Sequence, residues 1–112
     1  MKKYLVLYKA PIDASKQMAE TTPEQQAEGM KLWMDWAQKC GDQLLDLGQP
    51  LANGISLTPD GSTSADSQVA GFSIIQAEDM EGAQKLMQGH PHLLWDAACS
   101  IELHEAQPIP GM

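Results

Sequence analysis

Two histidines on either side of a proline are the first candidates for chemistry. His90 and His92 flank Pro91, and because imidazoles titrate near neutral pH, such a pair can relay a proton or bind a metal. A metal site needs further ligands, and Asp96, four residues after His92, adds little. The alternative is structural: His90 ends a helix, where a charged imidazole favours the dipole, and His92 packs in a loop. We expect no metal site and no cofactor.

Glu102 and His104 form a second candidate pair. They stand two residues apart in an alternating segment, so in a strand their side chains are neighbours on one face. A carboxylate beside an imidazole makes a workable base for proton transfer. The competing interpretation is that both lie near the mouth of a dimer interface and only satisfy one another or water.

Aromatic side chains can line a ligand pocket or act as weak acids. Tyr4 and Tyr8 share a face of the first strand, and either hydroxyl can act as a weak acid in a cavity or lie at an interface. Trp33, Trp36 and Trp95 can form a wall for a planar ligand, such as an aromatic or lactone substrate, or can pack in the core. The candidate acid–base groups are Tyr8, His90, Glu102 and His104, and the candidate ligand-binding residues are Met30, Trp33, His92 and Trp95.

The last third of the chain contains the elements that must position most of these groups. Residues 71–77 are short, β-branched and aromatic, which predicts a strand. Asp79 can cap a following helix whose apolar face comprises Met80, Ala83, Leu86 and Met87. A Gly-His-Pro-His corner then leads to a strand over 99–105, in which Cys99, Ile101 and Leu103 point one way and Ser100, Glu102 and His104 the other.

The first half of the chain repeats this order of elements. Residues 1–9 predict a strand, and Thr22-Pro23-Glu24-Gln25 predicts the capped start of a helix that ends at Cys40, with Gly41 as a left-handed stop. Its predicted core stripe is Ala27, Met30, Met34 and Ala37, with Leu32, Trp33 and Trp36 widening the apolar surface. A short strand over 43–47, an alternating arm at 55–57, a turn at 58–61 and a polar loop at 62–67 follow.

Two strand–helix–strand units predict a single α+β domain over residues 1–112, a ferredoxin-like βαββαβ fold with an antiparallel sheet. Both helices of that fold cover one face of the sheet, so the other face is solvated or covered by a second subunit. We expect the open face to carry Ser100, Glu102 and His104, with tyrosine and serine side chains from neighbouring strands. Two such sheets packed face to face would form a dimeric α+β barrel whose polar interior can hold a small ligand.

Charge and composition exclude several classes of function. Seven lysines and no arginine stand against 15 acidic residues, and the net charge is −8, which argues against nucleic acid, an anionic membrane surface and phosphoryl transfer. The two cysteines fit buried reduced thiols. Because the apolar run at the start is too short for a signal peptide and no segment is long enough for a membrane span, we expect a cytoplasmic protein.

Six segments, in order along almost the whole chain, carry a family likeness. They are Lys3-Tyr4-Leu5-Val6-Leu7-Tyr8, Thr22-Pro23-Glu24, Gly71-Phe72-Ser73-Ile74-Ile75, Asp79-Met80-Glu81-Gly82-Ala83, Gly89-His90-Pro91-His92-Leu93 and Ile101-Glu102-Leu103. In this order they resemble the YCII-related family, particularly its DGPF-type branch. The resemblance implies the dimeric α+β barrel and a homodimer.

The residues depart from the family where its chemistry is placed. The candidate catalytic pair of the better-studied branch is a His on the first helix and an Asp before a proline, but Met30 and His90 stand in those places here. The Asp-Gly-Pro-Phe motif is also missing, since Asp60-Gly61 is followed by Ser62-Thr63.

Two functions remain open from the sequence. The first is a small-ligand protein, a cofactor-independent lyase or isomerase that uses acid–base groups in the dimer cavity. The second is a non-catalytic dimerisation or regulatory module, which the missing catalytic pair favours. The first predicts a pocket with an inward imidazole, and the second predicts a filled interior with an exposed apolar patch, such as one at Leu32 and Trp36, that recruits a partner.

Overall fold

The computed structural model describes residues 1–12, 16, 19–65, 68–95 and 97–111, with the side chain of Trp95 also left undescribed. Its elements, in chain order, are β1 (Lys2–Lys9), α2 (Pro23–Cys40), a 3₁₀ turn (Gly41–Gln43), β2 (Leu44–Asp46), β3 (Ile55–Thr58), β4 (Gly61–Ser64), β5 (Val69–Ala77), α3 (Met80–Leu86), α4 (Pro91–Trp95) and β6 (Ser100–Glu105). Strands β2, β5, β1 and β6 form one antiparallel sheet in that order, and β3 and β4 form a separate hairpin.

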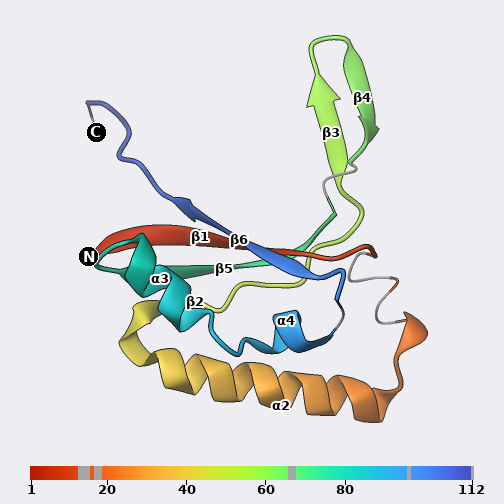
Figure 1. Ribbon diagram of the computed structural model, residues 1–112. Coiled ribbons are helices and arrows are strands. Elements are labelled where there is room, and N and C mark those ends of the chain that lie inside the picture. Colours follow the sequence, from red (N-terminus) through yellow and green to blue (C-terminus); the bar gives the residue numbers. More distant parts are fainter. Residues whose placement is uncertain (13–15, 17–18, 66–67, 96, 112) are drawn as a thin grey trace.

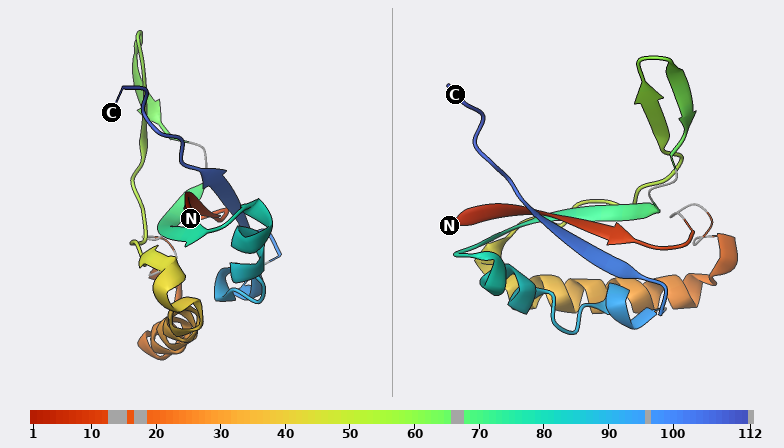
Figure 2. Two further views of the ribbon diagram at one scale, coloured as in Figure 1. Left: turned by 90° about the vertical axis from the view of Figure 1, so that its left-hand side faces the viewer. Right: turned by 45° about the horizontal axis from the view of Figure 1, so that its top comes forward.

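The sheet has one covered and one open face. Helices α2, α3 and α4 all lie on the same side of it, whereas the β3–β4 hairpin and the C-terminal segment project from the other side (Figures 1 and 2). This arrangement confirms the predicted α+β, ferredoxin-like fold. Its open face is the surface on which the sequence places the candidate Glu102–His104 pair.

Helix α2 starts and stops where the sequence indicates. The Thr22 side chain accepts a hydrogen bond from the Gln25 backbone N–H, and the Gln25 side chain accepts one from the Thr22 N–H, which completes a capping box. The helix ends at Cys40 because Gly41 follows with a positive φ of 57°, a conformation that glycine adopts without steric cost.

The core lies between α2 and the covered face of the sheet. Tyr4, Val6 and Tyr8 of β1 alternate into it and are at most 2% exposed. Helix α2 contributes the buried Trp36 and Cys40. Partly buried residues complete this cluster, among them Trp33, Ala37, Leu44, Leu47 and Leu86.

The predicted core stripe of α2 is wrong at both methionines. Met30 and Met34 are 57% and 45% exposed, because the buried line of the helix runs through the two tryptophans instead. The Trp36 indole N–H donates to the carbonyl oxygen of Leu86 at 2.8 Å. Two large rings and a partly buried hydrogen bond set the rotation of the helix, and the flexible methionines are left outside.

The middle of the chain also departs from the expected loops. The predicted strand at 43–47 is confined to Leu44–Asp46. Residues 62–64, predicted as loop, form β4 and pair with β3 around the expected turn, while residues 66 and 67 of that loop lie outside the described part of the chain. The corner after α3 contains a further short helix, α4, which begins at Pro91 as proline favours the first helical position.

Candidate functional site

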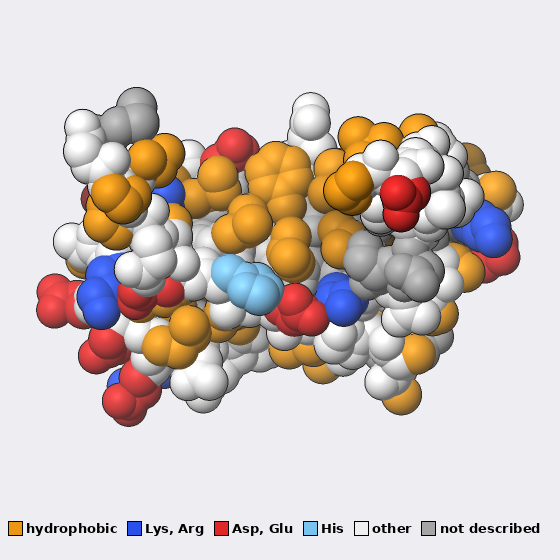
Figure 3. Space-filling view, turned by 90° about the horizontal axis from the view of Figure 1, so that it is seen from above, with side chains coloured by type: hydrophobic (Ala, Val, Ile, Leu, Met, Phe, Trp, Pro, Cys, Tyr) orange, Lys and Arg blue, Asp and Glu red, His pale blue; other side chains and the backbone are white. Residues whose placement is uncertain are grey.

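The open face of the sheet joins an apolar strip to a charged one. In β1, Leu5 and Leu7 lie on this face, where they pair on one side with Ile74 and Phe72 of β5. On the other side they pair with His104 and Glu102 of β6, and Lys9 pairs with Ser100. Figure 3 looks onto this surface and shows hydrophobic side chains gathered at its centre with a His, Glu and Lys row beside them.

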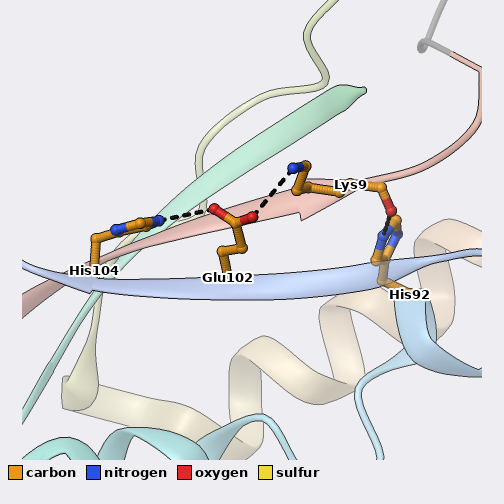
Figure 4. Close-up of polar contacts among 4 residues, drawn as sticks. All are labelled: Lys9, His92, Glu102 and His104. Carbon is orange, nitrogen blue, oxygen red and sulfur yellow. Dashed lines mark hydrogen bonds and ion pairs between the residues drawn. The ribbon is translucent and has the colours of Figure 1, made fainter. Parts of the chain in front are cut away.

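The charged row is a hydrogen-bonded chain of three side chains. His104 Nε2 lies 2.9 Å from one carboxylate oxygen of Glu102, and Lys9 Nζ lies 3.1 Å from the other (Figure 4). The His104 hydrogen bond, followed by the hydrogen bond and charge of Lys9, lowers the pKa of Glu102 below its usual range. Glu102 is therefore ionised at neutral pH and is held by two donors.

The hydrogen bond to Glu102 fixes the tautomer of His104. An ionised carboxylate only accepts hydrogen bonds, so the proton of the neutral imidazole resides on Nε2 and donates to Glu102. The lone pair of Nδ1 is left to accept a proton. A carboxylate that orients an imidazole in this way is a recurring arrangement for a general base.

His92 connects α4 to the strand that carries Lys9. Its ring Nε2–H donates to the carbonyl oxygen of Lys9 at 2.9 Å (Figure 4), and its backbone N–H donates to Nδ1 of His90 at 3.0 Å. The side chain is 8% exposed. The role of His92 in this structure is thus to tie the corner to the end of β1.

His90 lies inside the core and is fully buried. Its ring sits 4.5 Å from that of Trp33, 4.4 Å from Trp36 and 5.0 Å from Tyr8, measured between ring centroids. Burial, reinforced by the neighbouring His92, lowers the pKa of His90 to about 3. Because Nδ1 accepts the His92 N–H, the proton of the neutral ring is on Nε2, a buried atom that has no hydrogen-bond partner among the described residues.

Tyr8 belongs to the same buried group, which corrects the expectation that tyrosines line the open face. Its hydroxyl lies 2.8 Å from Ser73 Oγ, and Ser73 in turn donates to the carbonyl oxygen of Leu47 at 2.6 Å. A hydroxyl has one proton, so Tyr8 is the donor to Ser73. Burial raises the pKa of Tyr8 well above its ordinary value.

The sheet therefore separates the four candidate acid–base groups into two pairs. Glu102 and His104 meet on the open face, whereas Tyr8 and His90 meet in the core beneath the opposite face. The two pairs lie on opposite faces because side chains alternate strictly along a strand. Tyr8 is out of phase with Leu5 and Leu7, and therefore with the β6 residues paired with them.

The structure brings two of the candidate ligand-binding residues together in the core, away from the open face. Trp33 and His92 both pack against Tyr8, with ring centroids 4.7 Å and 5.3 Å from that of Tyr8. Met30 is exposed on α2. The backbone of Trp95 belongs to α4, and its side chain lies outside the part of the chain that the structure describes.

Sequence reasoning missed Lys9 and Ser73. Lys9 alternates in phase with Leu5 and Leu7, which could have placed it on the open face, but its contact with Glu102 spans 93 positions. For Ser73, the sequence indicates only that it lies in an apolar strand.

The described residues contain no cluster of three or more His, Cys, Asp or Glu side chains placed to hold a metal ion. The helices within that part of the chain are likewise too short or too polar to cross a membrane. Cys40 and Cys99 are both buried and are not joined in a disulfide.

A family model described as the YCII-related domain matches residues 3–105. No curated protein matches the sequence. The matched span includes the four-stranded sheet apart from Lys2, together with the hairpin and helices α2, α3 and α4.

Proposed function

The chain belongs to the YCII-related family, and from this premise we propose that it is a homodimer whose paired open faces enclose a small-ligand site with acid–base chemistry at His104. The observation that carries the proposal is the 2.9 Å hydrogen bond between Glu102 and His104 on the sheet face opposite helices α2, α3 and α4.

The composition of the open face supports a second copy as its cover. Leu5 is 37% exposed there, and Leu7, Phe72 and Ile74 are half-buried. A two-fold axis places the same patch on both sides, so apolar residues of one subunit meet apolar residues of the other. Glu102 is already neutralised by Lys9 within its own chain, which reduces repulsion between two chains that each carry a net charge of −8.

The chemistry that fits the pair is removal of a proton next to a carbonyl group. His104 Nδ1 accepts the proton, Glu102 stabilises the imidazolium that forms, and the C–H electron pair passes into an enolate. Return of the proton to a different carbon gives an isomerisation, whereas departure of a leaving group from the adjacent carbon gives an elimination. The Lys9 ammonium supplies positive charge on the same face, beside Glu102.

Exchange of substrate protons with solvent tests this proposal. The protein is incubated in D₂O with a panel of small unsaturated lactones and 2-oxo acids, and ¹H NMR follows loss of the proton next to the carbonyl. We expect catalysed exchange for at least one member of the panel and a drop of about 10²-fold or more in His104→Gln. Lys85→Gln serves as a control, because Lys85 lies on α3 and is paired only weakly with Glu81, 4.0 Å away.

A non-catalytic dimerisation module is the second candidate, and the burial of His90 favours it. His90 and Tyr8 are absorbed into the core, which leaves His104 as the accessible imidazole among the described histidines. A stable dimer that exchanges no proton in any member of the panel would support this function and contradict the first.

A further inference from the structure

The β3–β4 hairpin is an arm that projects from the sheet, with its strand residues exposed within the described part of the chain. All eight residues of its two strands are exposed, including Ile55 at 68% and Leu57 at 79%. Among the described strands, β3 and β4 pair only with each other. An isolated two-stranded hairpin is at best marginally stable in water. A hairpin with two large apolar side chains on one strand face would therefore be stabilised by a surface that covers them.

The chain as a whole exposes more surface than a compact monomer does. Its accessible area is 7843 Å², whereas a compact protein of 12.2 kDa exposes about 6,100 Å². The radius of gyration, 15.3 Å, likewise exceeds the roughly 13 Å expected for this length. The surplus, about 1,700 Å², is more than the roughly 800 Å² that each partner contributes to a stable interface.

The arm stands on the side of the molecule where a second subunit would sit. Figures 1 and 2 show the hairpin rising from one end of the open face, away from the helices, and the C-terminal segment rising from the other end. Packed sheets lie about 10 Å apart, and four strand residues span about 13 Å. An arm of this length therefore reaches past the sheet of a subunit packed on the open face.

The charges of the arm suit contact with another copy of this acidic chain. Between Ile55 and Ser64 the only ionisable residue is Asp60, at the turn. The strands of the arm are thus uncharged and offer apolar and hydroxyl side chains, which bring little repulsion to a partner of net charge −8.

We propose that the β3–β4 hairpin clasps a second copy of the chain, with Ile55 and Leu57 packed against the subunit that covers the open face. This inference rests on the proposed homodimer, and it adds the arm as the element that strengthens the association. The partner's arm does the same in return, so each dimer has two such contacts.

Sedimentation velocity over a range of concentrations tests the clasp with Leu57→Ser. Burying a leucine side chain is worth about tenfold or more in the equilibrium constant, and with two arms we expect the dimer Kd to rise about 100-fold. Leu94→Ser is the matched control, because Leu94 is 75% exposed but belongs to α4 on the helix side. The dimer Kd of the Leu94→Ser variant should equal that of the unmodified protein.

A second variant removes the arm without disturbing its base. The Ala65 N–H donates to the Gly54 carbonyl oxygen at 3.1 Å, so residues 55–64 can be replaced by a two-residue Asn-Gly turn. Circular dichroism checks that the rest of the chain stays folded, and the dimer should weaken at least as much as with Leu57→Ser.

The outcomes separate the two proposals. A dimer of unchanged Kd in both arm variants overturns the clasp and leaves the homodimer standing. An unmodified chain that stays monomeric up to millimolar concentration overturns both.

Discussion

His92 donates its Nε2 proton to the carbonyl oxygen of Lys9 across 2.9 Å. The same Lys9 places its ammonium group 3.1 Å from Glu102 on the other side of the sheet. One residue thus links the buried corner of the chain to the charged row on the open face. The position of the ammonium group depends on the end of β1, which His92 fixes from α4.

Glu102 should titrate at higher pH when His104 is removed. The His104 hydrogen bond is the largest single cause of its lowered pKa, and the hydrogen bond and the charge of Lys9 are the next two. We expect His104→Phe and Lys9→Met each to raise the Glu102 pKa toward its ordinary value, because each substitution removes a donor that stabilises the carboxylate. Titration of the ¹³C-labelled carboxyl group by NMR measures both shifts, and an unchanged pKa in His104→Phe would contradict the observed hydrogen bond.

Burial of neutral His90 should make the protein sensitive to acid. The unfolded chain protonates this imidazole below about pH 6.5, while the folded chain does so only near pH 3. The unfolded state therefore binds the extra proton between these values, and the free energy of unfolding should fall by about 1.4 kcal/mol per pH unit as pH decreases. Urea unfolding from pH 7 to pH 4 measures the slope, and His90→Gln should be flatter by that amount over the same range.

Tyr8 and Ser73 should differ in how much their hydroxyls stabilise the fold. Tyr8→Phe removes one donor, but Ser73 still donates to Leu47, so the cost should be about 1 kcal/mol. Ser73→Ala leaves the buried Tyr8 hydroxyl without its acceptor and the Leu47 carbonyl without this donor, which should cost about 2–3 kcal/mol. Chemical denaturation ranks the two variants, and the reverse order would contradict the assigned donor directions.

Two glycines should respond oppositely to alanine. A Cβ at Gly48 would lie 1.7 Å from the carbonyl oxygen of Phe72, and its φ is +80°, so Gly48→Ala should lose at least about 3 kcal/mol or fail to fold. A Cβ at Gly29, within α2, meets nothing within 4 Å, and Gly29→Ala should gain about 0.5–1 kcal/mol. Thermal unfolding compares the pair.

Local signals in the sequence were sufficient for most of the fold. The capping box at Thr22, the Asp79 cap and the alternation of β6 involve residues close together in the chain, and all three appear as expected. The exposure of Met30 and Met34 was not predictable in this way. The rotation of α2 depends on the hydrogen bond between Trp36 and Leu86, which lies 50 positions away.

The candidate site shows the same division between near and distant contacts. Glu102 and His104 are two residues apart, and their contact follows from strand geometry alone. The side of the sheet on which Tyr8 lies follows only from knowing which face the helices cover, and strand alternation does not specify that. Lys9 joins the pair through a register between β1 and β6 that no short motif encodes.

The strand order also sets the course of folding. Strand β1 lies between β5 and β6, so its hydrogen-bonding partners come from the last 44 residues of the chain. Such distant pairings require large loops to close before they gain contacts, which slows folding. During synthesis, the apolar first strand is without these partners until β5 and β6 have left the ribosome, and a strand exposed in this way favours aggregation.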